Sequence, residues 1–139
     1  MIILHLTDIH GNKGQISNLA KWLESADVVI LSGDITHFGR KSDTESIINE
    51  IEKYTKQMVC VTGNCDYPDV QSILEQREYF LGNKIKIIQN FQFLGLSGSL
   101  PCPGSTTNEY SEDQYRYFIE QLKININKTH PVIMVSHQP

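Results

Sequence analysis

The sequence lacks any hydrophobic run long enough to cross a membrane. No segment approaches the roughly 18 to 20 consecutive apolar residues that a membrane-spanning helix needs. The apolar start, from Met1 to Leu6, is short, follows no basic stretch and leads directly into Asp8, which is unlike a secretory signal peptide. We therefore expect a cytoplasmic protein that does not engage a membrane.

Cysteine and clustered basic residues are also scarce. The three cysteines, Cys60, Cys65 and Cys102, form no Cys-x-x-Cys spacing, which excludes a disulfide framework or a zinc knuckle as the organising feature. The net charge is −4 and the lysines are dispersed along the chain. The sequence therefore predicts no basic face of the kind that grips the backbone of nucleic acid.

What the sequence does contain is an alternation of short apolar runs with longer amphipathic ones. This pattern is typical of an α/β domain with a largely parallel sheet, and 139 residues suffice for one such domain. We expect residues 1–139 to form a single domain, with its first three strands buried. The expected strands are 2–6, 28–31, 58–61, 84–88, 91–96 and 132–135, the fourth and fifth forming a hairpin, and the expected helices are 13–25, 43–54, 69–80 and 111–122.

Residues that bind metals follow several of the predicted strands. Asp8 and His10 come after the first strand, Asp34 after the second, Asn64 after the third and His137 after the last. Because ligands bind outside the carboxyl ends of strands in open α/β sheets, these residues can converge although they are far apart in sequence. Asp8 and His10 would project to the same side if the backbone between them stays extended.

These residue types suit phosphate-ester chemistry. Two metals about 3.5 to 4 Å apart can clamp a phosphoryl group and activate a water, and Asp34 could give one carboxylate oxygen to each metal. Asn64 could supply a neutral oxygen and His137 an imidazole to the second metal. Gly33 and Gly63, each directly before a candidate ligand, would let the backbone turn sharply where the strands end.

Four motifs in this order resemble those of the calcineurin-like metallophosphoesterases. They are Asp8-Ile9-His10-Gly11-Asn12, Gly33-Asp34-Ile35-Thr36, Gly63-Asn64-Cys65-Asp66 and Val135-Ser136-His137. The resemblance implies an α/β/β/α sandwich with two facing mixed sheets, and attack on phosphorus by a hydroxide that bridges two divalent metal ions. The ions it implies are Mn²⁺ first, with Fe, Zn²⁺ or Ni²⁺ as alternatives. Carried over by position, Asp8, His10 and Asp34 serve one metal, and Asp34, Asn64 and His137 serve the other.

One departure from the family pattern concerns the catalytic group. Cys65 stands where most members have a catalytic histidine, which is similar to a branch of small phosphodiesterases and implies weaker protonation of the leaving group. We therefore assign the catalytic roles to Asp34, Asn64 and the Cys65 position, and favour phosphodiesters with good leaving groups. Asn12 and His37 are candidates for substrate binding, with a turn role and plain loop placement as their respective alternatives.

A second departure is larger, because the family closes with Gly-His-x-His and this sequence has no His-x-His pair. We expect the 139 residues to be the N-terminal portion of a longer protein, incomplete at the C-terminus, and this form to bind metals weakly. The expected function is a metal-dependent phosphoesterase acting on a small phosphate ester, with nucleic acid only as a phosphodiester substrate. The alternative is a phosphoesterase-fold scaffold for protein–protein interaction that is catalytically weak or inactive.

Overall fold

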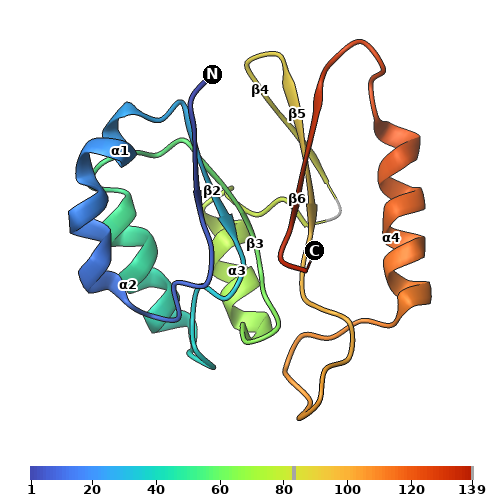
Figure 1. Ribbon diagram of the computed structural model, residues 1–139, viewed down its shortest axis with the longest axis horizontal. Coiled ribbons are helices and arrows are strands. Elements are labelled where there is room, and N and C mark those ends of the chain that lie inside the picture. The colour runs from blue at the N-terminus through green and yellow to red at the C-terminus, as the bar shows by residue number, and fades with distance from the viewer. Residues whose placement is uncertain (83, 139) are drawn as a thin grey trace.

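Two three-stranded sheets stand face to face in the computed structural model, which describes residues 1–82 and 84–138 (Figure 1). The strands of the first sheet run parallel in the order β1-β2-β3. In the second sheet β5 pairs antiparallel with β4 and parallel with β6, so this sheet is mixed. The strands are β1 (Ile3–Leu6), β2 (Val28–Ser32), β3 (Met58–Val61), β4 (Ile85–Ile88), β5 (Phe91–Leu96) and β6 (Val132–Ser136).

Helices cover the outer faces of both sheets. Figure 1 shows α1 and α2 outside the first sheet and α4 outside the second, which confirms the predicted α/β/β/α layering. The helical segments are the 3-10 helix η1 (Lys13–Leu19), α1 (Ala20–Ser25), α2 (Lys41–Ile51), α3 (Pro68–Gln76) and α4 (Glu112–Asn125).

Three hydrophobic clusters hold these layers together. The first, which includes Leu23 and Ile47, packs the helices against the first sheet. The second, which includes Val61 and Phe93, fills the space between the two sheets. The third joins α4 to the second sheet through Leu122. Since burial of apolar area is the main stabilising contribution in folding, the carboxyl ends of strands from both sheets are fixed relative to one another.

The first strand and the first helix differ from the prediction. The strand expected to be buried lies at the edge of its sheet, and the side chains of Ile2 and Ile3 are 60% and 38% exposed. The helix expected over residues 13–25 is a 3-10 helix up to Leu19 and an α-helix only afterwards. Its start is weak because Asn12 makes no capping hydrogen bond and Gly14 disfavours the helical backbone.

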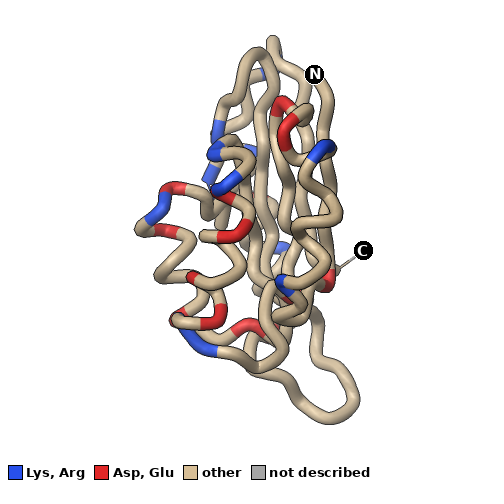
Figure 2. The backbone as a smooth tube through the Cα atoms, turned by 90° about the vertical axis from the view of Figure 1, so that its left-hand side faces the viewer, with Lys and Arg blue, Asp and Glu red and all other residues tan. Residues whose placement is uncertain are grey.

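The charged residues are distributed without a dominant sign. Figure 2 shows acidic and basic positions interleaved along the helical side of the molecule, so the charge of this face is mixed. Among the helices of residues 1–82 and 84–138, none combines the length and apolar character that a membrane span requires.

Candidate metal centre

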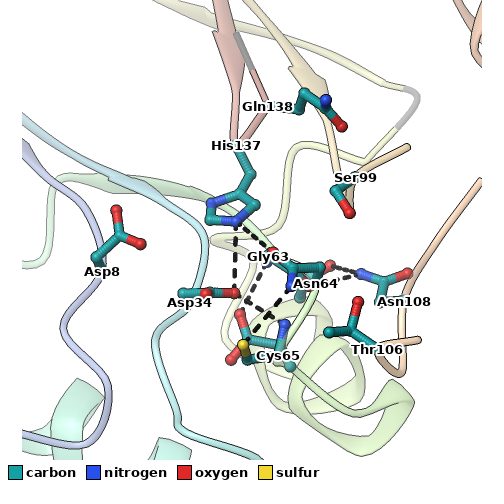
Figure 3. A network of polar contacts seen from close by, with 12 residues as sticks. Asp8, Asp34, Gly63, Asn64, Cys65, Ser99, Thr106, Asn108, His137 and Gln138 are labelled. Atoms are coloured by element: carbon teal, nitrogen blue, oxygen red, sulfur yellow. Dashed lines mark hydrogen bonds and ion pairs between the residues drawn. The ribbon is translucent and has the colours of Figure 1, made fainter. Parts of the chain in front are cut away.

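All five predicted ligands meet where strands of both sheets end. Figure 3 shows Asp34 between Asp8 and His137, with Asn64 beside it. One possible ligand atom from each of Asp8, Asp34 and His137 lies within 4.8 Å of the other two. Asp8, Asp34 and Asn64 follow β1, β2 and β3, in that order, whereas His137 follows β6 of the opposite sheet. The packing of the two sheets therefore brings this group together.

The Asp34 carboxylate faces two different sets of donors. Its Oδ2 lies 3.7 Å from Nε2 of His10, and its Oδ1 lies 3.5 Å from Nε2 of His137. Oδ1 also accepts the backbone N–H of Cys65 at 2.9 Å. Only 4% of Asp34 is exposed, so the side chain has little freedom to turn. This is the arrangement that a carboxylate bridging two metal ions requires.

Asp8 and His10 approach one another by a different route from the one expected. The two residues were expected to have an extended backbone, but both are in the left-handed region, with φ of 53° and 48°. The expectation was therefore wrong, although Nε2 of His10 still lies 3.6 Å from Oδ1 of Asp8. A backbone hydrogen bond of 2.9 Å from His10 to the carbonyl of Asp34 holds this turn against the loop after β2.

His137 directs Nε2 toward Asn64 and Asp34. Its Nδ1 lies 2.9 Å from the backbone carbonyl of Ser32, which can only accept, so Nδ1 carries the hydrogen. In the neutral ring Nε2 is then an acceptor, and it faces Oδ1 of Asn64 at 2.9 Å and Oδ1 of Asp34 at 3.5 Å. In this orientation of the Asn64 amide three acceptors converge on one point, which is a suitable place for a cation; without one, a proton on Nε2 or a turn of the amide by 180° would satisfy them.

The donor set fits divalent metal ions. Carboxylate, amide oxygen and imidazole suit divalent ions such as Mn²⁺ and Zn²⁺, and a histidine that donates its other N–H to a carbonyl is the usual state of a metal ligand. Asp8, His10 and Asp34 would hold one ion, while Asp34, Asn64 and His137 would hold a second. This division is the one that the family resemblance implied.

Glycine is required where the loops after β2 and β3 touch. Gly33 has φ of 94°, and a Cβ added there would lie 2.6 Å from Nδ1 of His137 and 2.7 Å from Cα of Gly63. A Cβ on Gly63 would in turn meet the carboxylate and backbone nitrogen of Asp34. A side chain at either position would therefore displace a candidate ligand.

Asp66 ties these two loops together, a role that the sequence analysis did not assign. Its Oδ1 accepts the backbone N–H and the hydroxyl of Thr36, and its Oδ2 accepts the N–H groups of Ile35 and Gly63, all at 2.8 to 3.2 Å. Burial raises the pKa of Asp66, while the hydrogen bonds from Gly63, Thr36 and Ile35 oppose the rise. The only signal in the sequence was its place in the third motif.

The loop between β5 and α4 clamps the turn that carries Asn64. The side-chain amide of Asn108 donates to the carbonyl of Gly63 at 2.9 Å and to the hydroxyl of Thr62 at 3.1 Å (Figure 3). Thr107 adds hydrogen bonds from its backbone N–H and its hydroxyl to the carbonyl of Asn64, at 3.1 and 3.0 Å. No local sequence pattern indicates this function, because the partners are more than 40 residues apart.

We expect Asn108→Ala to weaken metal binding at the Asn64 side about 10- to 100-fold, the usual consequence of removing a group that orients a metal ligand. Titration with Mn²⁺ followed by electron paramagnetic resonance would measure the change. Asn125→Ala, which truncates an exposed asparagine at the end of α4, serves as the matched control. Equal Mn²⁺ affinities for the two variants would contradict a positioning role for Asn108.

Cys65 lies beside the centre as a neutral thiol. It is 8% exposed, and burial raises the pKa of its thiol to about 12, with a hydrogen bond to Asp34 adding to the rise. Because the thiolate is the nucleophilic form of cysteine, this residue is not set up as a nucleophile near neutral pH.

The two candidates for substrate binding lie in different surroundings. His37 stands against His10, with ring centroids 5.2 Å apart, and lines a cavity beside it. Asn12 is exposed at the start of η1, and its backbone N–H closes a turn onto the carbonyl of Ile9. Direct substrate contact by either residue stays a prediction.

An α/β/β/α sandwich with carboxylate, amide and imidazole donors at its strand ends defines a protein built to bind metal ions. The chain matches the family model described as calcineurin-like phosphoesterase over residues 1–139, and it therefore belongs to this family.

The chain also resembles one protein in sequence and two solved structures in fold. The chain is 34% identical over 140 residues to the uncharacterized protein MJ1162 of Methanocaldococcus jannaschii. The match covers 100% of this chain and 61% of that protein. The crystal structure of TT1561 of Thermus thermophilus superposes with a TM-score of 0.80 at 15% identity, covering 95% of this chain and 65% of that one. A second solved structure gives a TM-score of 0.79 at 11% identity, covering 95% and 66%. At such low identities the two structures show the fold alone, and the chain spans less than two thirds of the length of each relative.

Proposed function

We propose that this protein is a phosphodiesterase that depends on two divalent metal ions, Mn²⁺ in the first place, and hydrolyses small phosphodiesters with good leaving groups. When bound, such ions supply charge neutralisation for the phosphoryl group and activation of a water. The observation that carries the proposal is the Asp34 carboxylate, whose oxygens face His10 on one side and His137 on the other.

The residues around the proposed metal ions have distinct roles in charge balance, loop geometry and proton donation. Asp34 and Asp8 bring negative charge to the centre, while Asn64 brings a neutral oxygen, so the site keeps a positive balance toward phosphate once ions are present. Gly33 and Gly63 allow the loops to approach closely enough for this. Cys65 stands where most members of the family have a catalytic histidine, and a thiol, with an ordinary pKa of about 8.5, protonates a departing oxygen less readily than an imidazolium with a pKa of about 6.5. A leaving group that departs without strong protonation is therefore favoured.

The test compares bis(4-nitrophenyl) phosphate with 4-nitrophenyl phosphate, using protein expressed from the complete reading frame. We expect kcat/KM for the diester to be higher by at least about tenfold, which corresponds to about 1.4 kcal/mol of transition-state stabilisation. Activity should disappear with a chelator and return with Mn²⁺.

Two results would overturn this proposal in different ways. A strong preference for the monoester would remove the diester assignment and leave a metal-dependent phosphoesterase. Tight, stoichiometric binding of Mn²⁺ without turnover of either ester would favour the scaffold alternative.

A further inference from the structure

We propose that a cavity beside His10 binds a second acidic group of the substrate, so that the preferred diesters carry an additional phosphate or carboxylate. The inference rests on the proposed function, because the cavity adjoins the candidate metal centre through His10. Its volume of about 350 Å³ lies within the range of about 300 to 1,000 Å³ typical of small-molecule sites. It is bounded by His10, the loop after β2 and the first two turns of α2.

Lys13 supplies the positive charge of this cavity. Its Nζ donates to Oγ of Ser46 on α2 at 3.1 Å, which holds the amine between η1 and α2. Lys53 and Lys123, in contrast, each form an ion pair of 2.6 Å with the glutamate three residues earlier in the chain. Across residues 1–82 and 84–138, no carboxylate lies within ion-pair distance of Lys13. Its ammonium group therefore keeps donors for an incoming oxyanion, as lysine does in many phosphate sites.

His37 is exposed and lines the cavity next to His10, a candidate metal ligand. One of its ring nitrogens lies within 4.8 Å of a nitrogen of His10 and of the Cys65 sulfur. Phe38 packs edge-on against His37, with centroids 5.1 Å apart, and has φ of 54°. A positive φ is uncommon for a residue other than glycine, and this turn places the exposed His37 beside His10. Its imidazole can donate one hydrogen bond to a ligand that reaches from the metals toward Lys13.

The remaining walls keep the cavity open. Asp43 is the one carboxylate among the lining residues, and its Oδ2 accepts the backbone N–H of Arg40 at 2.8 Å, so it serves the start of α2. A Cβ added to Gly39 would lie 2.9 Å from that Oδ2 and 3.0 Å from Cβ of Thr36. A side chain at this position would therefore crowd Asp43 and Thr36, whereas glycine leaves the space between them open.

Equilibrium binding tests the cavity without requiring turnover. The probes are benzylphosphonate and 4-carboxybenzylphosphonate, whose C–P bonds are not hydrolysed, and calorimetry in the presence of Mn²⁺ gives each Kd. We expect the carboxylate to tighten binding about tenfold, the range for a hydrogen bond to a charged group. In the Lys13→Met variant the two Kd values should become equal, and in the Ser46→Ala variant the ratio between them should be smaller than in the wild-type protein. Lys21→Met, which removes an exposed lysine from α1, should leave the ratio unchanged.

The outcomes separate this inference from the proposed function. Equal Kd values for the two probes in the wild-type protein, or equal ratios in the Lys13 and Lys21 variants, would overturn the cavity assignment even if bis-aryl phosphate is hydrolysed. A Lys13-dependent preference for the carboxylate probe would support the cavity even if no ester is turned over, in which case the enzyme proposal alone fails.

Discussion

Replacing Asp34 with asparagine should abolish turnover, with kcat/KM falling about 1,000-fold or more. The charge stabilisation that a metal ion contributes in phosphoryl chemistry is worth several kcal/mol, and each 1.4 kcal/mol is about a factor of ten in rate. Asparagine offers one oxygen where aspartate offers two, so either the His10 side or the His137 side would face an amide N–H₂ group. We expect the variant to bind fewer than two Mn²⁺ ions when metal content is measured by mass spectrometry.

The matched control is Asp113→Asn, which makes the same chemical change on an exposed residue in the first turn of α4. This variant should keep its activity and its metal content. If Asp34→Asn retained activity within a few-fold of the wild-type protein, the two-metal mechanism would be wrong, because among the described residues Asp34 is the one carboxylate within 4 Å of both His10 and His137.

The fold could be predicted where local sequence determines it. The strand Met58–Val61 and the hairpin of β4 and β5 agree with the prediction because these segments are short, mostly apolar and bounded by polar residues. The exposure of Ile3 could not be predicted in this way, since it depends on which strands lie beside β1 in the sheet. Likewise, a helical pattern of apolar residues does not distinguish the 3-10 turns of Lys13–Leu19 from an α-helix.

The site shows the same division between local and tertiary information. The positions of Asp34 and Asn64 after their strands predicted that they converge, because parallel strands present their carboxyl ends at one edge. The contribution of Asn108 arises from hydrogen bonds to a turn 45 residues earlier, which no spacing in the sequence indicates. The left-handed backbone at Asp8 likewise accompanies a contact between loops, the hydrogen bond of 3.2 Å from its N–H to the carbonyl of Gly33, which no spacing in the sequence indicates.

Asp66→Asn should cause the largest loss of stability among single substitutions near the site. We expect the free energy of unfolding to fall by about 2 to 6 kcal/mol, since each buried donor left without an acceptor costs about 1 to 3 kcal/mol. This is a large share of the roughly 5 to 15 kcal/mol that stabilises a typical domain. Urea denaturation would measure the change. The control is Asp27→Asn, whose exposed carboxylate accepts one backbone hydrogen bond from Ile2, and whose effect should stay below about 1 kcal/mol.

Neither orientation of the new amide can satisfy the four donors around Asp66. In one orientation its N–H₂ group faces the N–H groups of Ile35 and Gly63, and in the other it faces both donors of Thr36. Either way, the loop that carries Asp34 or its link to the turn that carries Asn64 loses an anchor, so Mn²⁺ affinity should fall together with stability. Unchanged stability with weakened Mn²⁺ binding would mean that Asp66 acts on the metal centre itself. Unchanged values of both would mean that the packing between the two sheets, and not this carboxylate, holds the two loops in register.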